Sequence, residues 1–268
     1  MKNFIKISNM AAMLGISPNG LRKYEEYGIV SPSSSEDTGH RKYKMMDLPM
    51  LINVRRYRQF GYPLEEIVSM LNEEELSELR QKHFLYLEQK EEEIQQIRCK
   101  IKRMEEVIEL IDEARFGIKT MRTCVRPAMW LLPVINEGKF LKSNQYKNIS
   151  GYWISHIPSA CISCILPKDI IKNPGTQDYK YMFSIFEEDA LVWKLKMMNQ
   201  VHQIPAEFCI KSYHIQNHEE ETLHEAIKPL LNFVQENKLG PGGDIITRGV
   251  LFAKKLYREV WIPIHQSP

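Results

Sequence analysis

The stretch that decides the fold runs from residue 7 to residue 43 and reads ISNMAAMLGISPNGLRKYEEYGIVSPSSSEDTGHRKY. Apolar residues recur in its first part at helical spacing, at Ile7, Met10, Ala11 and Leu14. Gly15 follows them, where a left-handed residue can end a helix at least cost. Ser17 can cap a second helix, and Pro18 suits the first helical position because its missing N–H is not needed there. The pattern predicts one helix ending at Gly15 and another from about Pro18 to Tyr27, closed at Gly28.

This helix pair has the geometry that places a second helix in a DNA major groove, and Arg22 and Lys23 lie on that helix. A plain αα-hairpin is the alternative, since such corners are common in all-α domains. Residues 33–41, SSSEDTGHR, are too polar and turn-rich for a core, and the side chains from Gly39 to Tyr43 alternate as a wing strand requires. The stretch therefore predicts a winged helix-turn-helix.

Four segments resemble the DNA-binding domain of the MerR family of bacterial transcription regulators: IKISNMAAMLGIS, LRKYEEYGIVSP, GHRKY and DLPMLINVRRYRQFGYPLEEIVSML. The resemblance covers about the first seventy residues. Gly20 and Lys23 depart from the family, which generally carries a threonine and an aromatic residue there, so the operator sequence stays open. The DNA-binding candidates from the motif and the resemblance are Ser17, Asn19, Arg22, Lys23, Tyr24, His40, Arg41, Tyr43, Arg55 and Arg56. For the cluster from Arg55 to Arg58, a solvated helix face is the alternative to a contact with the DNA backbone.

The composition is that of an ordinary folded protein, with 43% hydrophobic residues among 268. Its net charge of +2 divides into +3 over residues 1–72, −5 over 73–116 and +4 over 117–268. No apolar run approaches the roughly 20 residues of a membrane span, and the N-terminus lacks the apolar core of a signal peptide. Five cysteines without a framework spacing favour reduced thiols. We therefore expect a cytoplasmic protein without membrane contact, with a DNA-binding domain (1–72), a dimerisation helix (73–116) and a distal domain (117–268).

Residues 73–114 contain neither proline nor glycine and predict one long helix. Its apolar residues follow a heptad, with Leu87, Ile94, Ile101 and Ile108 at position a and Ile97, Met104 and Ile111 at position d. A helix of this length spans roughly 60 Å, more than one globular domain needs, so it requires a partner. Packing within its own chain is the alternative. The MerR resemblance implies antiparallel pairing in a homodimer, whose two recognition helices would bind an inverted repeat with half-sites about 34 Å apart.

Residues 117–268 alternate predicted strands and helices. The first set comprises strands near 123–132, 160–166 and 179–186, with a helix near 146–156. The second set comprises strands at 207–213, 244–252 and 257–264, with a helix at 218–237. This is a βαββ order twice over, a repeat visible in element order alone. Together with the closing YREVWIPI, it resembles the GyrI-like effector-binding domain appended to many MerR regulators, so we expect an α+β protein.

A glutamate in the closing strand carries the ligand hypothesis. GyrI-like domains place a glutamate in their ligand pocket, and Glu259 is the matching position, where it would attract a lipophilic cation. The alternative is a surface glutamate on an edge strand, paired with a lysine or an arginine. The other ligand candidates are aromatic residues, which as a class pack more often in a core than against a ligand: Trp130, Tyr152, Trp153, Tyr181, Phe183, Trp193 and Trp261.

Two clusters invite a metal site, yet neither favours one. Cys161 and Cys164 in CISC stand three residues apart, which a strand places on opposite faces. The segment HEEETLHEA puts His218, Glu221, His224 and Glu225 on a predicted helix without a third convergent ligand, so a solvated face is favoured. No phosphate-cradling glycine loop occurs, and we expect no cofactor.

We therefore expect a homodimeric, ligand-responsive transcription regulator and not an enzyme. The family resemblance implies activation by distortion of an overlong promoter spacer, so that RNA polymerase is engaged indirectly, through the DNA. Two alternatives stay open. Some GyrI-like domains hydrolyse reactive electrophiles, with Glu259 then a general base or a nucleophile. A closed cleft would instead leave a DNA-bending regulator without a ligand.

Overall fold

The structure is a computed structural model and describes residues 4–34, 41–73, 75–136, 139–140, 144–171, 179–196, 200–217 and 221–265. It divides into two compact units, Met1–Gln89 and Lys90–Pro268. The boundary falls inside the long helix, which we expected to form a segment of its own from residue 73 to residue 116. The reason is packing: His83 of this helix bonds to Tyr62 in the first unit, whereas Leu110 packs on the distal sheet.

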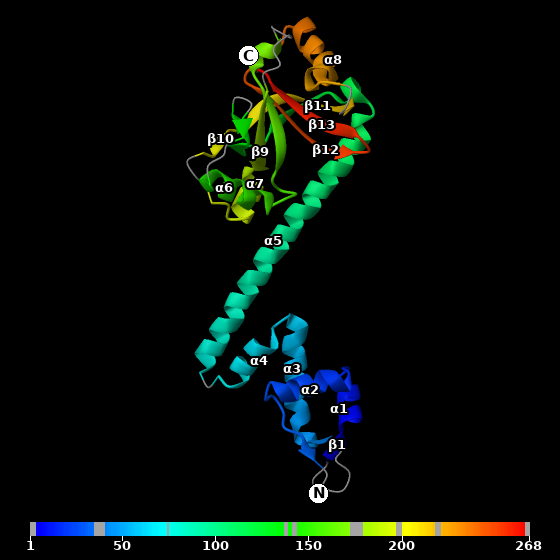
Figure 1. Ribbon diagram of the computed structural model, residues 1–268, viewed down its shortest axis with the longest axis vertical. Helices are drawn as coiled ribbons and strands as arrows, with labels where there is room; N and C mark the ends of the chain where they lie inside the picture. Colours follow the sequence, from blue (N-terminus) through cyan, green and yellow to red (C-terminus); the bar gives the residue numbers. More distant parts are fainter. Residues whose placement is uncertain are drawn as a thin grey trace. The chain divides into compact units, whose positions relative to one another are not determined.

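The N-terminal unit combines a helix-turn-helix with a small wing sheet (Figure 1). Its elements are β1 (Phe4–Lys6), α1 (Ile7–Met13), α2 (Pro18–Glu26), β2 (Ser33–Ser34), β3 (Arg41–Lys44), the 3-10 turn η1 (Met45–Asp47), α3 (Leu48–Phe60) and α4 (Leu64–Leu71). The wing sheet has the order β1-β3-β2. The sequence pattern did not predict β1, which pairs antiparallel with β3 and so links the start of the unit to its wing.

Local signals set the helix ends in this unit, and at Gly15, Ser17 and Gly28 these agree with the prediction. The Ser17 hydroxyl accepts the N–H of Gly20 at 3.1 Å, and Pro18 opens α2. Gly15, Gly28 and Gly61 adopt positive φ angles of 62°, 70° and 99°. Only glycine takes such angles without strain from a Cβ atom, which is why each helix stops there. These turns fix the direction of α2 relative to α1.

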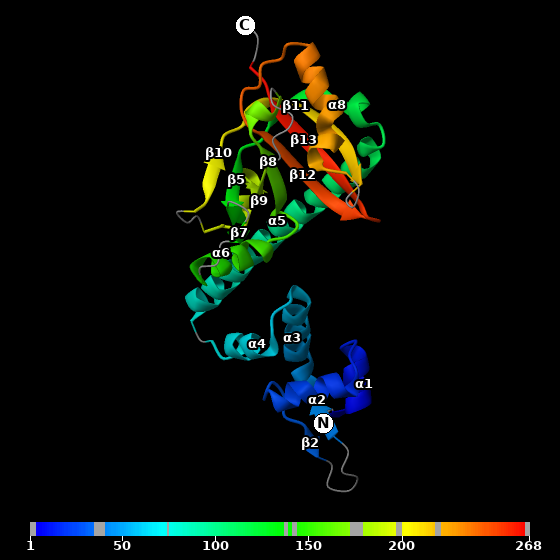
Figure 2. The same cartoon turned by 45° about the horizontal axis from the view of Figure 1, so that its top comes forward.

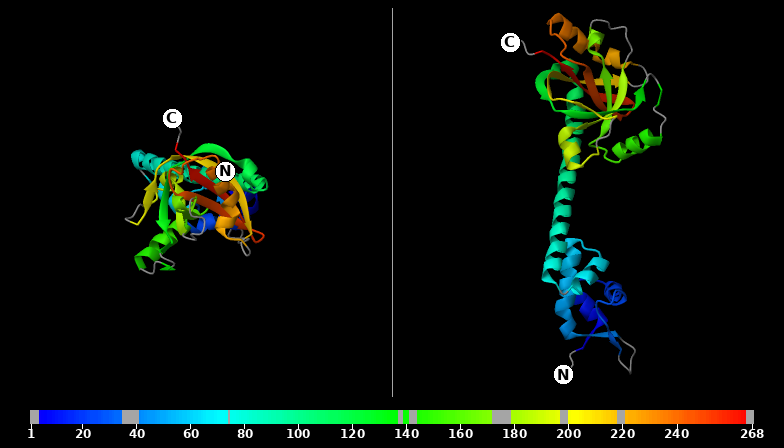
Figure 3. Two further views of the ribbon diagram at one scale, coloured as in Figure 1. Left: turned by 90° about the horizontal axis from the view of Figure 1, so that it is seen from above. Right: turned by 90° about the vertical axis from the view of Figure 1, so that its left-hand side faces the viewer.

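Helix α5 (Leu76–Ala114) runs through 39 residues without interruption (Figure 3). One side of it buries Cys99, Arg103, Leu110 and Ala114. The other side carries an apolar stripe whose members are between 48% and 63% exposed: Leu87, Ile94, Ile97, Ile101, Met104 and Ile108. Helix α5 therefore fits a coiled coil, and it also packs within its own chain. In the described part of the chain, no helix has both the length and the apolar character needed to cross a membrane.

The distal unit is built on one sheet, whose eight described strands lie in the order β10-β5-β9-β8-β12-β13-β11-β4 (Figure 2). The strands are β4 (Arg122–Arg126), β5 (Met129–Pro133), β8 (Cys161–Leu166), β9 (Lys180–Phe186), β10 (His202–Ile204), β11 (Glu207–Asn217), β12 (Ile245–Phe252) and β13 (Lys255–Pro263). A separate pair consists of β6 (Ile135–Asn136) and β7 (Lys139–Phe140). The helices are α6 (Asn144–Ile154), α7 (Glu187–Val192) and α8 (Leu223–Glu236), with 3-10 turns η2 (Gly117–Thr120) and η3 (Lys168–Ile171).

The sheet consists of two βαββ units with the same strand order. The first unit is β5-α6-β8-β9 and the second is β11-α8-β12-β13; in both, the last strand lies between the other two. The units meet at the antiparallel pair β8–β12, where Cys164 lies opposite Thr247. The single strand predicted over 123–132 is in fact two strands, because β4 pairs with β11 and β5 pairs with β9 in the other unit. Pro127 lies between them and has no N–H to continue a ladder.

The strand register sorts side chains onto two faces of this sheet. The residues Ser212, Val260, Thr247, Cys164 and Tyr181 lie opposite one another on five adjacent strands. We call the face on which these residues lie the helix face, because Val260 packs on α8. Phe183 lies on the same face, two residues after Tyr181, and packs on α6. The neighbouring residues point the other way: Tyr213, Glu259, Arg248, Ser163 and Met182. We call the face on which these residues lie the α5 face, because Tyr213 packs against Leu110 and Ala114 of that helix.

A buried ion pair joins α5 to the distal unit. The side chains of Arg103 and of Asp189 in α7 are each 2% exposed, with Nε and Oδ2 3.2 Å apart. Charge holds these two atoms together, since they lack hydrogen-bond geometry. Arg103 also reaches Glu106 at 2.6 Å and Glu188 at 2.9 Å. This cluster determines which side of α5 meets the sheet and which side carries the exposed stripe.

We expect Asp189→Ala to lower the free energy of unfolding of the distal unit by about 3 kcal/mol or more, because it leaves the buried Arg103 without its buried counter-ion. The Arg103→Met, Asp189→Leu double variant should regain part of this loss, since it removes both charges. Thermal unfolding followed by tryptophan fluorescence measures both. Glu188→Ala is the control, because the Glu188 side chain is 50% exposed and its pair contributes little. Equal losses for Asp189→Ala and Glu188→Ala would contradict the anchoring role.

Candidate functional site

Helix α2 has a polar face that is exposed and an apolar face that packs in the core. Leu21 is fully buried, whereas Arg22 and Lys23 are exposed. Arg22 donates from Nη1 to Asn19 Oδ1 at 2.7 Å, which holds the guanidinium along the helix. Asn19 and the capping Ser17 are exposed as well. The predicted residues of α2 other than Tyr24 therefore share one outward surface.

Glu25 joins α2 to the wing strand. Its carboxylate accepts a hydrogen bond from Arg41 Nε at 3.2 Å and another from the Tyr43 hydroxyl. Burial, followed by this hydrogen bond, raises the pKa of Tyr43, so the hydroxyl keeps its proton and acts as the donor. The Arg41 side chain remains 51% exposed and can still meet an anion. Helix and wing are thus held as one surface.

Two predicted contacts lie in the core. Tyr24 is 5% exposed and Tyr43 is fully buried. Neither ring can lie against a nucleic acid while it is packed in this way. Both residues instead support the surface that Arg22, Lys23 and Arg41 form, which corrects the expectation that they contact DNA themselves.

The cations of α3 differ from one another. Arg55 donates from Nε to the Leu14 carbonyl at 3.1 Å and so ties α3 to the end of α1. Arg58 donates to the Tyr62 carbonyl at 2.6 Å. Arg56 is exposed. Within the basic cluster, Arg56 is therefore the arginine whose side chain makes no hydrogen bond to another described residue. His40, also predicted as a contact, lies outside the described residues.

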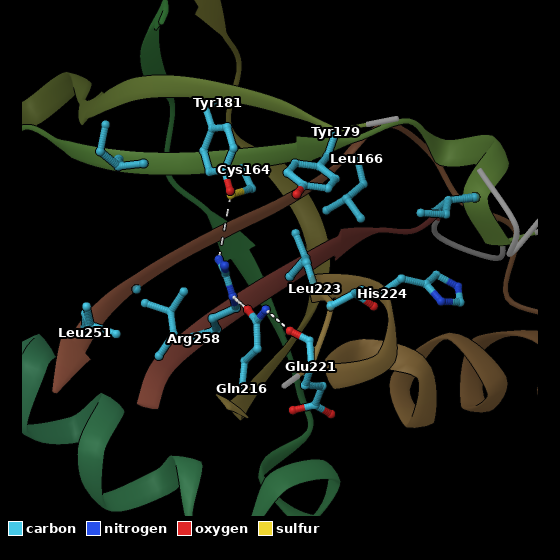
Figure 4. Close-up of a pocket in the computed structure, with 15 residues that line it drawn as sticks. Cys164, Leu166, Tyr179, Tyr181, Gln216, Glu221, Leu223, His224, Leu251 and Arg258 are labelled. Carbon is cyan, nitrogen blue, oxygen red and sulfur yellow. Dashed lines mark hydrogen bonds between the residues drawn. The ribbon is translucent and has the colours of Figure 1, made fainter. Parts of the chain in front are cut away.

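A cavity of about 480 Å³ opens on the helix face, and we call it the helix-face cavity (Figure 4). Both βαββ units line it, with Ile162, Cys164, Leu166, Ile170, Tyr179, Tyr181, Gln216, Glu221, Thr222, Leu223, His224, Gly249, Leu251, Leu256 and Arg258. Of the predicted ligand residues, Tyr181 is among them. Burial raises the pKa of Tyr181 to about 12, so its hydroxyl stays protonated at neutral pH. The cavity thus combines apolar walls with a few polar groups, as small-molecule sites do.

A second cavity of about 300 Å³ lies between α5 and the sheet, and we call it the α5-face cavity. Its charged members are Arg103, Glu106, Arg248 and Glu259, set among apolar side chains such as Leu110. Burial raises the pKa of Glu106, against the opposing influence of Arg103. This cavity therefore contains charges of both signs: Arg103 forms an ion pair with Glu106, and Arg248 donates from Nε to Cys161 Sγ.

Glu259 lies on the α5 face and forms an ion pair with Lys211, in which each side chain is 15% exposed. Its strand β13 lies between β12 and β11, so Glu259 is not on an edge strand. Glu259 lines the α5-face cavity and is absent from the described lining of the helix-face cavity. The carboxylate is therefore largely buried, as the ligand hypothesis requires, and paired with a lysine, as its alternative requires.

Most predicted aromatic ligand residues belong to the core of the first βαββ unit, where α6 packs on its strands. They are Trp130, Tyr152, Trp153, Phe183 and Trp193. None of the five is among the described residues that line either cavity. Trp261 packs in a different cluster on the α5 face, with its ring 6.3 Å from that of Phe186. Of the aromatic candidates, Tyr181 is thus the one in the described lining of these two cavities, and the other six pack in core clusters.

Residues that the sequence pattern missed carry the polar character of the helix-face cavity. Arg258 and Gln216 are 5% and 6% exposed and lie on adjacent strands. The signal was present in YREVWIPI, where Arg258 adjoins Glu259 and alternation must place the two on opposite faces. Which of the two faces holds the larger cavity follows only from the tertiary packing.

The cysteines of CISC lie on opposite faces of β8, as predicted. Cys161 Sγ accepts a hydrogen bond from Arg248 Nε at 2.9 Å on the α5 face, and Cys164 lines the helix-face cavity. Within the described ranges, no group of three or more His, Cys, Asp and Glu side chains has an arrangement suited to a metal. His218 of HEEETLHEA falls outside those ranges.

Comparison with known proteins places the N-terminal unit in a family context. Residues 5–74 match the family model described as MerR HTH family regulatory protein. The chain is 30% identical to the HTH-type transcriptional activator TipA of Streptomyces coelicolor over 82 residues, which is 30% of this chain and 32% of TipA. It is 35% identical to the HTH-type transcriptional regulator CueR of Escherichia coli over 68 residues, 25% of this chain and 50% of CueR. The chain therefore spans half or less of the length of these relatives.

One solved structure with similarity is a MerR-family transcriptional regulator from Bacillus cereus. The identity is 25%, the match covers 41% of this chain and 84% of that chain, and the TM-score is 0.37. A structure titled as an EcmrR–DNA complex matches 98% of this chain and 100% of its own at 14% identity and the same TM-score of 0.37.

Proposed function

We propose that this chain, whose residues 5–74 carry a MerR-type helix-turn-helix, is a DNA-binding transcription regulator that acts as a homodimer. The observation that carries the proposal is the surface shared by α2 and the wing. Arg22 and Lys23 project from a helix whose inner side is buried, and Glu25 fixes Arg41 beside them. Cations held in this way suit the phosphate backbone and the base edges of a major groove.

Dimerisation through α5 supports the same proposal. The apolar stripe exposes six large side chains at heptad spacing, while the opposite side of the helix is already covered by its own chain. An apolar surface of this kind is costly in water and is relieved by a second copy of the helix. A two-fold dimer would present two α2 helices to an inverted repeat.

The distal unit is the proposed effector receptor. Its two βαββ units with equal strand order and the EVWIPI ending support a GyrI-like domain, and the helix-face cavity between the units has a volume typical of small-molecule sites. An effector can change the activity of the regulator only by binding one conformation more tightly, about 1.4 kcal/mol for each tenfold shift in population. Activation by DNA distortion, with RNA polymerase reached through the DNA, completes the proposal.

The proposed role is regulatory and not enzymatic. The relatives named above are transcriptional regulators. Glu259, the candidate general base of the hydrolase alternative, is occupied by its ion pair with Lys211.

We expect Arg41→Ala to weaken binding to all DNA sequences alike and to reduce the dependence of affinity on salt by about one unit of slope, as the loss of one phosphate contact does. Arg22→Ala should also reduce discrimination between the selected site and random DNA. Binding sites selected from random duplexes, followed by titrations at several salt concentrations, provide the measurement. Lys228→Ala, an exposed cation on α8, removes the same charge far along the chain and serves as the matched control. An Arg22→Ala, Arg41→Ala variant that binds like the Lys228→Ala control would rule out this surface.

We expect Ile101→Asp to abolish the dimer, since burying a carboxylate in the stripe costs several kcal/mol per copy against about 12 kcal/mol for a nanomolar association. Light scattering gives the mass. Gln95→Asp places the same carboxylate on an exposed position of α5 outside the stripe and should remain dimeric. A dimer that survives Ile101→Asp unchanged would locate the interface elsewhere.

A further inference from the structure

The helix-face cavity contains a buried cation without a buried counter-ion. Arg258 lines the cavity and is 5% exposed. Its Nε donates to Gln216 Oε1 at 2.6 Å and its Nη1 toward Cys164 Sγ at 3.8 Å (Figure 4). The same Nη1 donates to Thr247 Oγ1 at 3.0 Å. These acceptors are neutral. No ion pair connects Arg258 to a carboxylate in the part of the chain that the structure describes.

A buried charge is costly unless an opposite charge accompanies it. The described acid of the cavity lining, Glu221, forms no ion pair with Arg258 in the described part of the chain, and its Oε2 accepts the backbone N–H of Asn217 at 3.1 Å. The guanidinium is therefore hydrogen-bonded and electrically uncompensated among the described groups. A ligand that brings a negative charge would remove that cost.

The remaining lining describes the other end of such a ligand. Leu166, Ile170 and Leu223 form an apolar wall, and Leu251 and Leu256 add to it from the second βαββ unit. Tyr179 and Tyr181 contact each other edge to face, with ring centres 5.4 Å apart. A volume of about 480 Å³ accommodates a chain or ring of moderate size.

We propose that the helix-face cavity binds a small amphipathic carboxylate, whose anionic head pairs with Arg258 and whose apolar tail lies against the leucine and tyrosine wall. This rests on the proposed function and names the effector class. A guanidinium meets a carboxylate through two parallel hydrogen bonds, which makes arginine the suitable residue for this head group. The lipophilic cation suggested for Glu259 has the weaker case, because that carboxylate already has Lys211 and lies on the opposite face of the sheet.

Binding of three eight-carbon probes to the full-length wild-type chain tests the charge preference directly. Octanoate, octan-1-ol and octylammonium share a tail and differ in head-group charge. Calorimetry should show octanoate binding at least about tenfold more tightly than the other two, as a charged hydrogen-bonded pair implies. Octanoate should also raise the melting temperature of the chain most. If octanoate binds no more tightly than octan-1-ol, or if octylammonium binds best, the proposal is wrong.

Variants locate the preference at Arg258. Arg258→Gln should weaken octanoate binding by about 10- to 100-fold and leave octan-1-ol within about threefold, while Arg258→Lys should retain part of the preference. Lys228→Gln removes a cation of the same unit outside the cavity and is the matched control. Circular dichroism shows whether each variant folds. The wild-type comparison decides the matter even if Arg258→Gln does not fold. An undiminished octanoate preference in folded Arg258→Gln would overturn the assignment.

DNA binding separates this inference from the proposed function. A full-length chain that selects an inverted repeat but shows no octanoate preference would refute the carboxylate effector and leave the regulator intact. A chain that shows the octanoate preference but binds no DNA specifically would refute the regulator and leave the cavity assignment intact.

Discussion

The buried ion pair between Arg103 and Asp189 determines how α5 packs on the distal unit. A charged pair with side chains 2% exposed cannot rotate into solvent or exchange partners without a large loss of free energy. It therefore fixes the rotation of α5 about its own axis. The helix has 3.6 residues per turn, so once Arg103 points at the sheet, Ile94, Ile101 and Ile108 must point away from it. One ion pair thereby decides that the apolar stripe faces outward.

Within the sheet, the alternation of side chains along each strand determines which residues lie on which face. Arg258 and Glu259 are neighbours in sequence, yet they belong to different faces and different cavities. The cation has neutral acceptors, whereas the anion has Lys211. The two faces therefore differ in charge: the cavity on the α5 face has acids and bases in its lining, whereas Arg258 on the helix face has neutral acceptors among the described residues. A shift of register by one residue would exchange them, which is why the long β11–β13 and β12–β13 ladders matter for specificity as well as for stability.

How far the sequence predicts this structure depends on the range of the forces involved. The helix ends at Gly15 and Gly28, the cap at Ser17 and the length of α5 arise from local signals and were predicted closely. Residues 123–132 were predicted as one strand although Pro127 interrupts the ladder, and the pairing of β4 and β5 with opposite halves of the sheet depends on tertiary packing. The burial of Tyr24, Tyr43 and Trp153 was likewise not predictable, since an aromatic residue suits a core and a binding surface equally. For Glu259 the strand was identified correctly, but the side on which the larger cavity lies depends on how α5, α6 and α8 cover the sheet.

Gly249 lines both cavities, and a Cβ atom there would lie 2.3 Å from the Tyr257 carbonyl oxygen. At this point a single layer of backbone separates the space open to a ligand from the charged cluster under α5. If a ligand in the helix-face cavity changes the stability of the charged cluster under α5, then a change in that cluster must change the binding free energy of the ligand by the same amount. If pairing of two chains through α5 reorganises that cluster, the apparent affinity for the ligand depends on the concentration of the protein itself. The thin layer of backbone at Gly249 would then make the response of the chain to its ligand depend on the concentration of the chain.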